Sequence, residues 1–330
     1  MDRASGHDTV TRALWYAAPG QAILRTETIP APRPDEVLVQ THYSALSRGT
    51  ESLVFAGAVP EAEHHRMRAP FQAGAFPFPV KYGYAAVGTV MAGPHDLLGR
   101  AVFALHPHQS AFVVPAAAVV ALPAGLPPRR AVLAANMETA LNALWDAAVL
   151  PGSRIAVVGI GTVGALVAWL AGQIPGTEVI AVDIRPEQAA IAGALGVGFA
   201  TPGNAPIDCD LVFHASATPE GLATAVAAAG DEATIIELSW YGDRTVAATL
   251  GGAFHSRRLR LLASQVGSVA PSMRARWPHR RRLAQAIALL ADPRLEVLLE
   301  PDVAFEDLPG ALPALLGPGG AAMCQVVTYP

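Results

Sequence analysis

The chain has 330 residues, of which 52% are apolar and 15% charged, with a formal net charge of −4 and a pI near 6.2. This composition excludes a disordered chain, and the acidic balance excludes a protein that coats a nucleic-acid backbone. The length predicts two domains with sizeable cores.

The cysteine count and the apolar runs bear on the compartment. Cys209 and Cys324 are too few for a disulfide framework or a four-cysteine zinc site, so we expect reduced thiols. The N-terminal segment lacks the apolar run of a secretory signal, which favours a cytoplasmic protein. The uncharged run 155–174 is long enough to span a membrane, but the three glycines in its first ten residues favour a strand, a turn and a helix. We therefore expect no membrane and no nucleic acid among the partners.

The first part of the chain, from residue 10 to about 122, is expected to be rich in β-strands. Short strand-like runs there are divided by proline and glycine, as at 36–43, 85–93 and 110–122. The cluster Ser47-Arg48-Gly49-Thr50-Glu51 follows one such run and fits either a surface turn or a wall of an active site. Apolar residues at a period of 3.6 then predict a helix over 130–149.

From residue 154 strands and helices alternate. Short, uniformly apolar strands between helices predict a parallel sheet that is covered on both faces. The expected strands are 154–160, 178–184, 209–215 and 233–239, and the expected helices are 164–174, 186–196 and 219–230. A basic helix over 280–293 and a final strand over 324–330 follow. The arginines between Arg274 and Leu283 are interpreted as a solvated face, with binding of an acidic group as the alternative.

The sequence VVGIGTVG places Gly159, Gly161 and Gly164 in a G-x-G-x-x-G pattern between a strand and a helix. This context is typical of dinucleotide binding. The first glycine allows a tight turn, the second lets the backbone approach the pyrophosphate, and the third lets the helix pack closely on the strand. The helix N-terminus offers free N–H groups to the anion, and Thr162 and Val163 complete the expected cofactor-binding turn.

Asp183 ends the next strand, nineteen residues after Gly164. Its carboxylate is expected to accept hydrogen bonds from the adenosine ribose and to repel a 2′-phosphate, which favours NAD(H). Arg185 would favour that phosphate, so NADP(H) stays open as an alternative. A site that is empty or takes another nucleotide is a further alternative.

The order of a β-rich domain, a dinucleotide-binding domain and a return to the first domain resembles the medium-chain dehydrogenase/reductase superfamily over nearly the whole chain. The segments RPDEVLVQTHYSALSRGTE, GYAAVGTV and GRAVFAL resemble the family's GPGEVLV…GICGTD, GHEAVGTV and GDRV. The resemblance implies an α/β fold, with a GroES-like catalytic domain over 1–135 and 266–330 and a doubly wound Rossmann domain over 136–265. Locally, GTESLVFAGAVP and PVKYGYAAVG are most similar to the bacteriochlorophyllide 2-hydroxyethyl dehydrogenase group.

The family's zinc ligands are replaced in this chain. Arg48 and Tyr84 stand where the cysteine of CGTD and the histidine of GHE would be, and Ala85 replaces the glutamate. An arginine cannot ligate zinc because its guanidinium stays protonated. The four-cysteine lobe is missing, and AANMETALNA resembles the GLTAY segment of zinc-free quinone oxidoreductases. The resemblance thus implies a zinc-independent enzyme, with the close pair His106 and His108 as the alternative metal ligands.

The resemblance also places Arg48, Thr50 and Tyr84 around the position of the missing metal. Arg48 would face a developing alkoxide, and its charge would lower the pKa of Tyr84, which supplies an O–H. Thr50 matches a hydroxyl that relays the substrate proton, and His106 matches a position that lines the pocket. The alternatives are an Arg48–Glu51 ion pair, simple packing of Tyr84, and a surface loop at His106.

Two further positions follow from the resemblance. Thr139 and Val163 match residues that touch the nicotinamide ring. Glu138, inside an otherwise apolar helix, is expected either at a solvent edge or as a buried partner of Arg48.

The predicted activity is hydride transfer between NAD(H) and a small-molecule carbonyl or secondary alcohol. The predicted assembly is a homodimer, joined through the apolar strand ATIIELSWYG (233–242). The alternative functions are an NADPH-dependent quinone or enone reductase and a nucleotide-binding protein without catalysis.

Overall fold

The computed structural model describes residues 8–317, 319–320 and 323–330, and their contacts form two compact units. One unit combines 1–135 with 299–330, and the other is 136–298. The sequence predicted that the chain returns to the first unit at residue 266, whereas in the structure it returns at residue 299. The segment 266–298 packs with the parallel sheet instead, because Arg282 is bonded there to Glu138 and Asn142. The segment 1–7, part of the region used to argue against a signal, lies outside the described residues.

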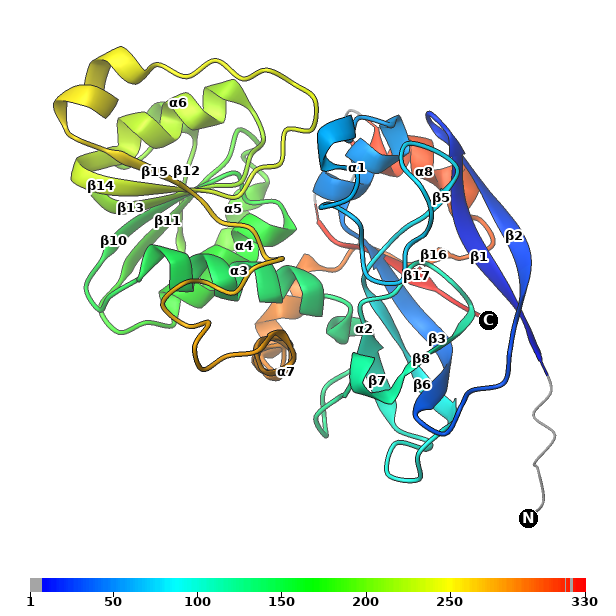
Figure 1. Cartoon of the computed structure of the whole chain (residues 1–330). Coiled ribbons are helices and arrows are strands. Elements are labelled where there is room, and N and C mark those ends of the chain that lie inside the picture. Colours follow the sequence, from blue (N-terminus) through cyan, green and yellow to red (C-terminus); the bar gives the residue numbers. More distant parts are fainter. Residues whose placement is uncertain (1–7, 318, 321–322) are drawn as a thin grey trace. The chain divides into compact units, whose positions relative to one another are not determined.

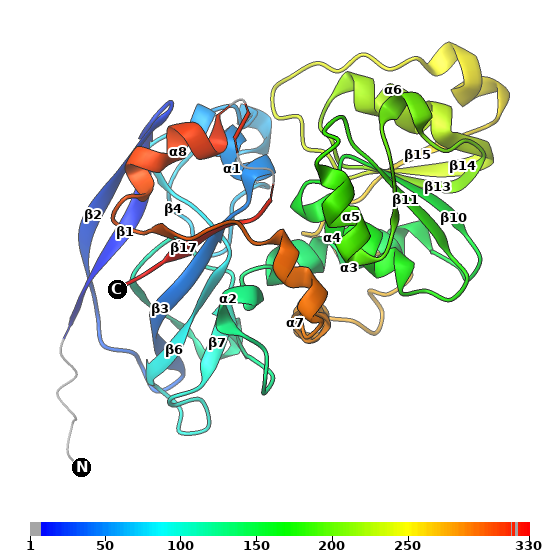
Figure 2. The same ribbon diagram turned by 180° about the vertical axis from the view of Figure 1, so that it is seen from behind.

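The first unit is built from two mainly antiparallel sheets (Figures 1 and 2). The smaller has the order β2-β1-β5-β4, with β1 (Thr9–Ala18), β2 (Gln21–Ile29), β4 (Ala73–Gly74) and β5 (Val80–Lys81). The larger has the order β16-β17-β3-β6-β7-β9, with β8 paired to β3. Its strands are β3 (Glu36–Leu46), β6 (Ala86–Ala92), β7 (Ala101–Ala104), β8 (Ala111–Pro115), β9 (Val119–Ala121), β16 (Val303–Ala304) and β17 (Gln325–Thr328).

Alternating burial along β3 explains how this larger sheet forms its core. Val37 and Val39 are fully buried, and they pack with Phe112 of β8 and Val102 of β7. A strand with one apolar face is stable only when that face is covered. The expectation of a β-rich first part is therefore confirmed.

Three helices accompany these sheets: α1 (Arg48–Ala56), α2 (Pro128–Ala131) and α8 (Leu308–Leu316). The cluster Ser47–Glu51 proves to be the start of α1, a helix that the sequence did not predict. The helix ends at Gly57, whose φ of 73° is the left-handed conformation of a glycine C-cap.

The second unit contains an entirely parallel sheet of order β12-β11-β10-β13-β14-β15. Its strands are β10 (Arg154–Val158), β11 (Glu178–Val182), β12 (Gly198–Ala200), β13 (Cys209–His214), β14 (Ala229–Glu237) and β15 (Arg260–Ala263). The order reverses between β10 and β13, as in a doubly wound nucleotide-binding fold. The predicted parallel sheet is confirmed.

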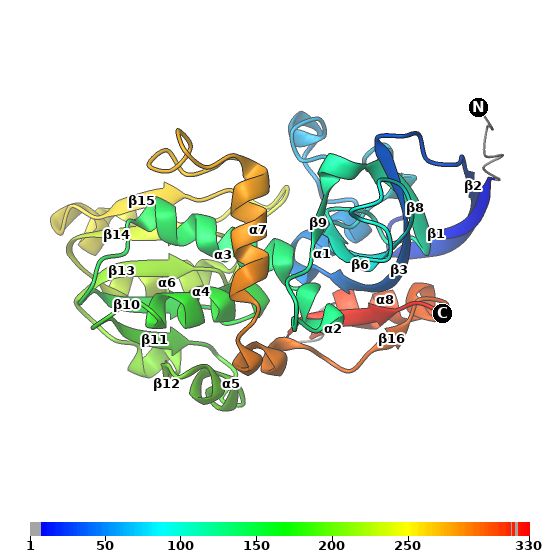
Figure 3. The same cartoon turned by 90° about the horizontal axis from the view of Figure 1, so that it is seen from below.

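Helices cover both faces of this sheet: α3 (Ala134–Ala147), α4 (Thr162–Gly172), α5 (Gln188–Leu195), α6 (Pro219–Ala228) and α7 (His279–Leu289). Figure 1 shows α6 over one face and α3 and α4 over the other, and Figure 3 shows α7 beside α3 and α4. Helix α4 is buried from Gly164 to Ala171, which accounts for its apolar sequence. Within the described parts of the chain, every helix is too short or too polar to cross a membrane.

The predicted dimer strand does not lie at a sheet edge. β14 pairs with β13 on one side and with β15 on the other. β15 is the edge strand, and its Leu261 and Leu262 are 45% and 43% exposed. The prediction was wrong on this point because residues 260–263 add one more strand beyond the run that looked terminal.

Candidate active site

The glycine-rich turn joins β10 to α4 with the geometry that a dinucleotide requires. Gly159 has a φ of 88°, and a Cβ there would lie 2.6 Å from the Ser216 backbone. A Cβ on Gly164 would overlap the Gly159 carbonyl oxygen. Gly161 is the N-cap of α4, and Thr162 and Val163 are partly exposed in its first turn. The first N–H groups of a helix have no partner within it, so this turn can receive a pyrophosphate.

Asp183 is placed at the end of β11 beside this turn and is 7% exposed. Its Oδ2 accepts a hydrogen bond from the Ile160 backbone N–H at 3.0 Å. Its Oδ1 accepts from the backbone N–H of Arg185 at 3.0 Å and from the Arg185 Nε at 3.1 Å. Asp183 therefore braces the glycine turn and holds Arg185. The carboxylate and the guanidinium compensate each other's charge.

Three hydroxyl groups come together in the first unit. The Ser47 and Thr50 side chains lie close enough to the Tyr84 hydroxyl that both tend to lower its pKa. Burial and the negative charge of Glu51 raise the pKa of Tyr84 to about 12. The expectation that Arg48 lowers this pKa was wrong, because burial and Glu51 dominate. Tyr84 is thus a hydrogen-bond donor at neutral pH rather than a phenolate.

Glu51 has partners other than Arg48. It is fully buried and accepts hydrogen bonds from the Tyr16 hydroxyl at 2.7 Å and from the Ser47 backbone N–H at 2.8 Å. His108 Nε2 lies 3.0 Å from the same carboxylate. Arg48 instead donates from Nη2 to the carbonyl of Gly317 at the end of α8, at 3.2 Å. An Arg48–Glu51 pair is therefore not what holds this turn.

His106 is not a surface residue. Its ring is 5% exposed, stacks on Phe112 at 3.9 Å between centroids, and lies 2.9 Å through Nδ1 from the Pro107 carbonyl. Burial lowers the pKa of His106 to about 3, so the ring is neutral near pH 7. Such a histidine does not exchange protons at neutral pH.

The donor atoms near Tyr84 do not suit a catalytic zinc. Zinc requires thiolate, imidazole or carboxylate ligands. The carboxylate near Tyr84, that of Glu51, is already bonded to Tyr16, to Ser47 and to His108. His108 has both ring nitrogens engaged, Nε2 with Glu51 and Nδ1 with Ser44 Oγ at 2.7 Å. Within the residues that the structure describes, no three His, Cys, Asp or Glu side chains are grouped for a metal.

Glu138 is buried and pairs with Arg282, not with Arg48. Arg282 Nε donates to Glu138 at 3.0 Å, and Nη1 donates to Asn142 at 2.6 Å. The same guanidinium donates to the carbonyls of Val266 and Ser268. Arg282 is 1% exposed, so it does not belong to a solvated face. Thr139, on the same helix, is partly exposed.

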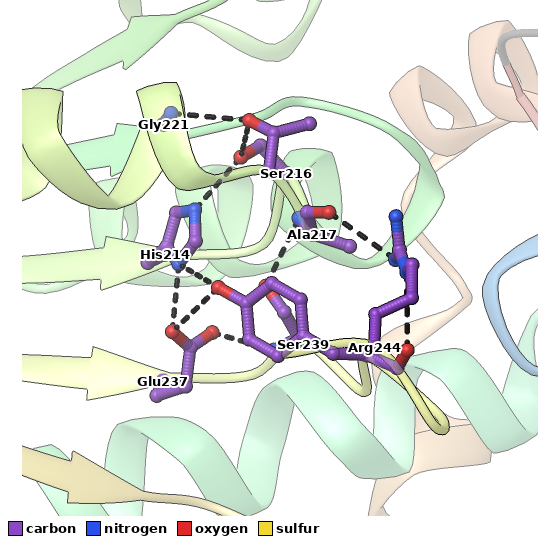
Figure 4. Close-up of polar contacts among 9 residues, drawn as sticks. His214, Ser216, Ala217, Gly221, Glu237, Ser239 and Arg244 are labelled. Atoms are coloured by element: carbon purple, nitrogen blue, oxygen red, sulfur yellow. Dashed lines mark hydrogen bonds and ion pairs between the residues drawn. The ribbon is translucent and has the colours of Figure 1, made fainter. Parts of the chain in front are cut away.

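The sequence reasoning missed a polar cluster at the carboxyl ends of β13 and β14 (Figure 4). His214 lies between the Glu237 carboxylate at 2.8 Å and the Ser216 hydroxyl at 2.7 Å. The signal was visible, since polar residues end two successive apolar strands. Parallel strands bring such ends to one edge of the sheet, where ligands bind.

Solved structures of similar fold span nearly the whole chain. L-idonate 5-dehydrogenase from Escherichia coli matches with a TM-score of 0.81 and 15% identity, over 99% of this chain and all of that one (100%). A dehydrogenase from Sinorhizobium meliloti, described as zinc-binding and bound to NADP, matches with a TM-score of 0.77 and 18% identity. The match covers 97% of this chain and 99% of that one. An alcohol dehydrogenase from E. coli CFT073 in complex with NADH matches with a TM-score of 0.76 and 16% identity, over 97% and 99%.

The chain has the fold of these dehydrogenases. The predicted fold class, a GroES-like β-rich domain with a Rossmann domain, is thereby confirmed. No protein-family model matches the sequence.

Proposed function

We propose that the protein is an oxidoreductase that moves a hydride between a nicotinamide dinucleotide and a carbonyl or secondary alcohol. The glycine turn is the observation that carries this proposal. Gly159 and Gly164 leave no room for a Cβ, and the turn lies where the strand order reverses. The fold shared with dehydrogenases agrees with it. A bound nicotinamide ring would supply the hydride chemistry, and the chain's residues would bind, orient and polarise.

We also propose that the reaction needs no zinc. Tyr84, protonated because its pKa is about 12, would donate a hydrogen bond to the substrate oxygen. The hydroxyls of Thr50 and Ser47 would orient Tyr84 and replace its proton. Arg48 would hold α1 against the end of α8, and His106 would shape the pocket as a neutral ring.

The local resemblance to the bacteriochlorophyllide 2-hydroxyethyl dehydrogenase group supports a secondary alcohol and its ketone as the substrate pair. A quinone or enone reductase remains the alternative enzyme, and a nucleotide-binding protein without catalysis the alternative of another class. Incubation with NADH and a panel of ketones, enones and quinones tests all three through the nicotinamide absorbance. Ketones should be reduced fastest. Binding of NADH without turnover of any compound would contradict an enzymatic role, and preferential turnover of enones or quinones would favour the reductase.

The cofactor is proposed to be NAD(H), with Asp183 deciding the choice. Asp183→Asn should narrow the preference for NADH over NADPH by about tenfold or more, because it removes the repulsion between a carboxylate and a 2′-phosphate, and each 1.4 kcal/mol of repulsion is about tenfold in affinity. The asparagine keeps an oxygen for the Ile160 N–H and frees Arg185 to meet the phosphate. Dissociation constants for both cofactors measure the change.

Asp231→Asn is the matched control, because it removes the same charge from an exposed site on β14. It should leave both affinities unchanged. Equal affinities for NADH and NADPH in the parent protein would show that Asp183 does not read the ribose.

We further propose a cytoplasmic homodimer that pairs through β15. An unpaired strand edge offers free N–H and C=O groups, and the two exposed leucines add apolar area. Light scattering at micromolar concentration should give the mass of two chains. The double variant Leu261→Lys with Leu262→Lys should give the mass of one. A parent protein that is monomeric would contradict this proposal.

A further inference from the structure

The cluster beyond β13 is built on strand pairing. His214 and Glu237 end adjacent parallel strands and are direct partners in the sheet register. Ser216 follows in the turn that leads from β13 into α6, and Figure 4 shows all three side chains directed toward one another. His214 is fully buried, whereas Ser216 is partly exposed. One end of the cluster therefore reaches the surface of the turn.

The hydrogen bonds fix the direction of the chain of donors. Burial tends to raise the pKa of Glu237, but the bonds from His214 and Ser239 outweigh it, so this pKa lies below its usual range and the carboxylate is charged. Glu237 accepts from the Ser239 backbone N–H at 2.8 Å and from the Tyr241 hydroxyl at 3.2 Å. Nδ1 is the ring nitrogen of His214 that faces Glu237. Because a carboxylate can only accept a hydrogen bond, Nδ1 must carry a proton.

Toward a ligand, the Ser216 hydroxyl can then act only as an acceptor. When the single ring proton is on Nδ1, Nε2 carries a lone pair, and the Ser216 O–H donates to it across 2.7 Å. Thr218 Oγ1 accepts from the Gly221 N–H at 3.0 Å and lies 3.0 Å from Ser216 Oγ, to which it can donate. One lone pair of Ser216 remains for a ligand. That ligand must be a hydrogen-bond donor.

Two glycines show that space for this arrangement is restricted. A Cβ on Gly221 would overlap Ser216 Oγ and come within 2.9 Å of His214 Nε2. A Cβ on Gly159 would strike the backbone of Ser216. Ser216 thus adjoins the first glycine of the dinucleotide turn. Its neighbour Ala215 donates its N–H to the carbonyl of Val158, the last residue of β10.

The sheet topology indicates which part of a dinucleotide passes Ser216. The pyrophosphate would lie at the turn after β10, and the adenosine ribose would face Asp183 after β11. β13 flanks β10 on the opposite side from β11. The second ribose, which carries the nicotinamide, would therefore pass the end of β13.

We propose that Ser216, His214 and Glu237 form a subsite for a ribose hydroxyl on the nicotinamide side of the dinucleotide. Ser216 Oγ accepts a hydrogen bond from that hydroxyl. His214 and Glu237 are positioning residues, because they fix Ser216 as an acceptor. The subsite rests on the proposed function for its ligand. It adds a side-chain hydrogen bond to the ribose, which the glycine motif does not supply.

A serine, a histidine and a carboxylate in this order also resemble a nucleophilic triad. An acyl-transfer site needs backbone N–H groups for the oxyanion, and the first of these follows the nucleophile. Here the N–H of Ala217 is already donated to Ser239 Oγ at 3.1 Å. The observations therefore favour binding over nucleophilic catalysis.

The test compares ligands that contain or lack the second ribose. Calorimetry is carried out with ADP, ADP-ribose and NADH on the parent, on Ser216→Ala, and on the control Thr224→Ala, whose hydroxyl lies on the exposed side of α6. Ser216→Ala should weaken ADP-ribose and NADH by about two- to tenfold, the worth of one hydrogen bond. It should leave ADP unchanged, and the control should leave all three ligands unchanged.

Glu237→Gln tests the positioning role separately. The amide would donate to His214 Nδ1, so the ring proton would move to Nε2. That N–H would then donate to Ser216 Oγ and occupy the lone pair that the ligand needs. Nitrogen NMR of His214 should report the Nδ1–H tautomer in the parent and the Nε2–H tautomer in the variant. The affinity for ADP-ribose should fall in this variant, while the affinity for ADP should not change.

Several results would overturn the subsite. If Ser216→Ala lowered the affinities for ADP and ADP-ribose equally, Ser216 would only support the glycine turn. Unchanged ADP-ribose affinity would mean that Ser216 does not contact the ribose. Labelling of Ser216 by a fluorophosphonate would identify a nucleophile instead. Failure of the parent to bind both ADP and NADH would overturn the proposed function, and the subsite with it.

Discussion

Tyr84→Phe is expected to lower kcat by about 10² or more, because general acid help from one positioned group contributes 10²–10⁴ in rate. The variant keeps the ring and removes only the hydroxyl, whose pKa the nearby Ser47 and Thr50 side chains influence. NADH affinity should change little, since the glycine turn belongs to the other unit. Steady-state kinetics on the preferred ketone, with cofactor affinity measured in parallel, give the result.

Tyr82→Phe is the matched control. Tyr82 is buried and its ring lies 6.0 Å from that of Tyr84, but Ser47 and Thr50 are not among the groups that shift its pKa. It should keep kcat within a few-fold of the parent. A Tyr84→Phe protein with the parental kcat would remove the tyrosine from the mechanism and leave Thr50 as the proton donor to be examined.

The pH profile shows whether Arg48 acts on the pKa of Tyr84 or only holds α1 against the end of α8. With a pKa of about 12, Tyr84 keeps its proton throughout the usual range of assays, so it should produce no basic limb there. Arg48→Met should leave the profile in place, because Arg48 is not among the causes of the shift at Tyr84. It should instead lower the stability of the first unit by removing the bond to Gly317.

Arg282→Met is expected to lower the free energy of unfolding of the parallel-sheet unit by about 3–5 kcal/mol, the usual cost of breaking a buried ion pair. The variant leaves Glu138 without its cation and removes the donors to Asn142, Val266 and Ser268. The melting temperature should fall by roughly 10 °C or more. Calorimetric or circular-dichroism melting measures it.

Two variants serve as controls for this pair. Arg281→Met, on the same helix, removes an exposed guanidinium stacked on Trp277 and should cost about 1 kcal/mol or less. Glu138→Gln keeps an acceptor for Arg282 and should cost less than Arg282→Met. Arg282→Met with the parental melting temperature would contradict a structural role for the buried pair.

Glu138 also gives a pH effect whose sign is defined. Burial raises its pKa more than Arg282 lowers it, so the folded protein holds the proton more tightly than the unfolded chain does. The free energy of unfolding contributed by this group therefore rises as the pH falls through the folded pKa. Glu138→Gln should remove this contribution.

The features predicted well from the sequence were those set by near neighbours in the chain. One short segment contains the apolar strand that ends in Val158, the three glycines and the following helix. Their pattern fits only a strand, a tight turn and a helix. The position of Asp183 at the end of a strand beside the glycine turn was predictable for the same reason, since strand, turn and helix lengths fix how far along the chain the next strand must end.

The features predicted poorly depend on residues far apart in the sequence. Glu138 meets Arg282 across 144 positions, and Glu51 meets His108 across 57. No local pattern indicates such pairs, and burial, which decides the pKa of Tyr84, is a property of the whole fold. Proximity in sequence suggested Arg48 as the partner of Glu51, but in α1 the Glu51 carboxylate points into the core while Arg48 reaches α8.

We propose that this fold catalyses hydride transfer with protein hydroxyls in place of zinc. The most direct test is turnover of the preferred ketone with NADH after exhaustive chelation, with the metal content of the same sample measured by elemental analysis. We expect full activity in a sample that contains far less than one zinc per chain. Stoichiometric zinc that chelators remove together with the activity, and that restores it on addition, would contradict a zinc-independent mechanism.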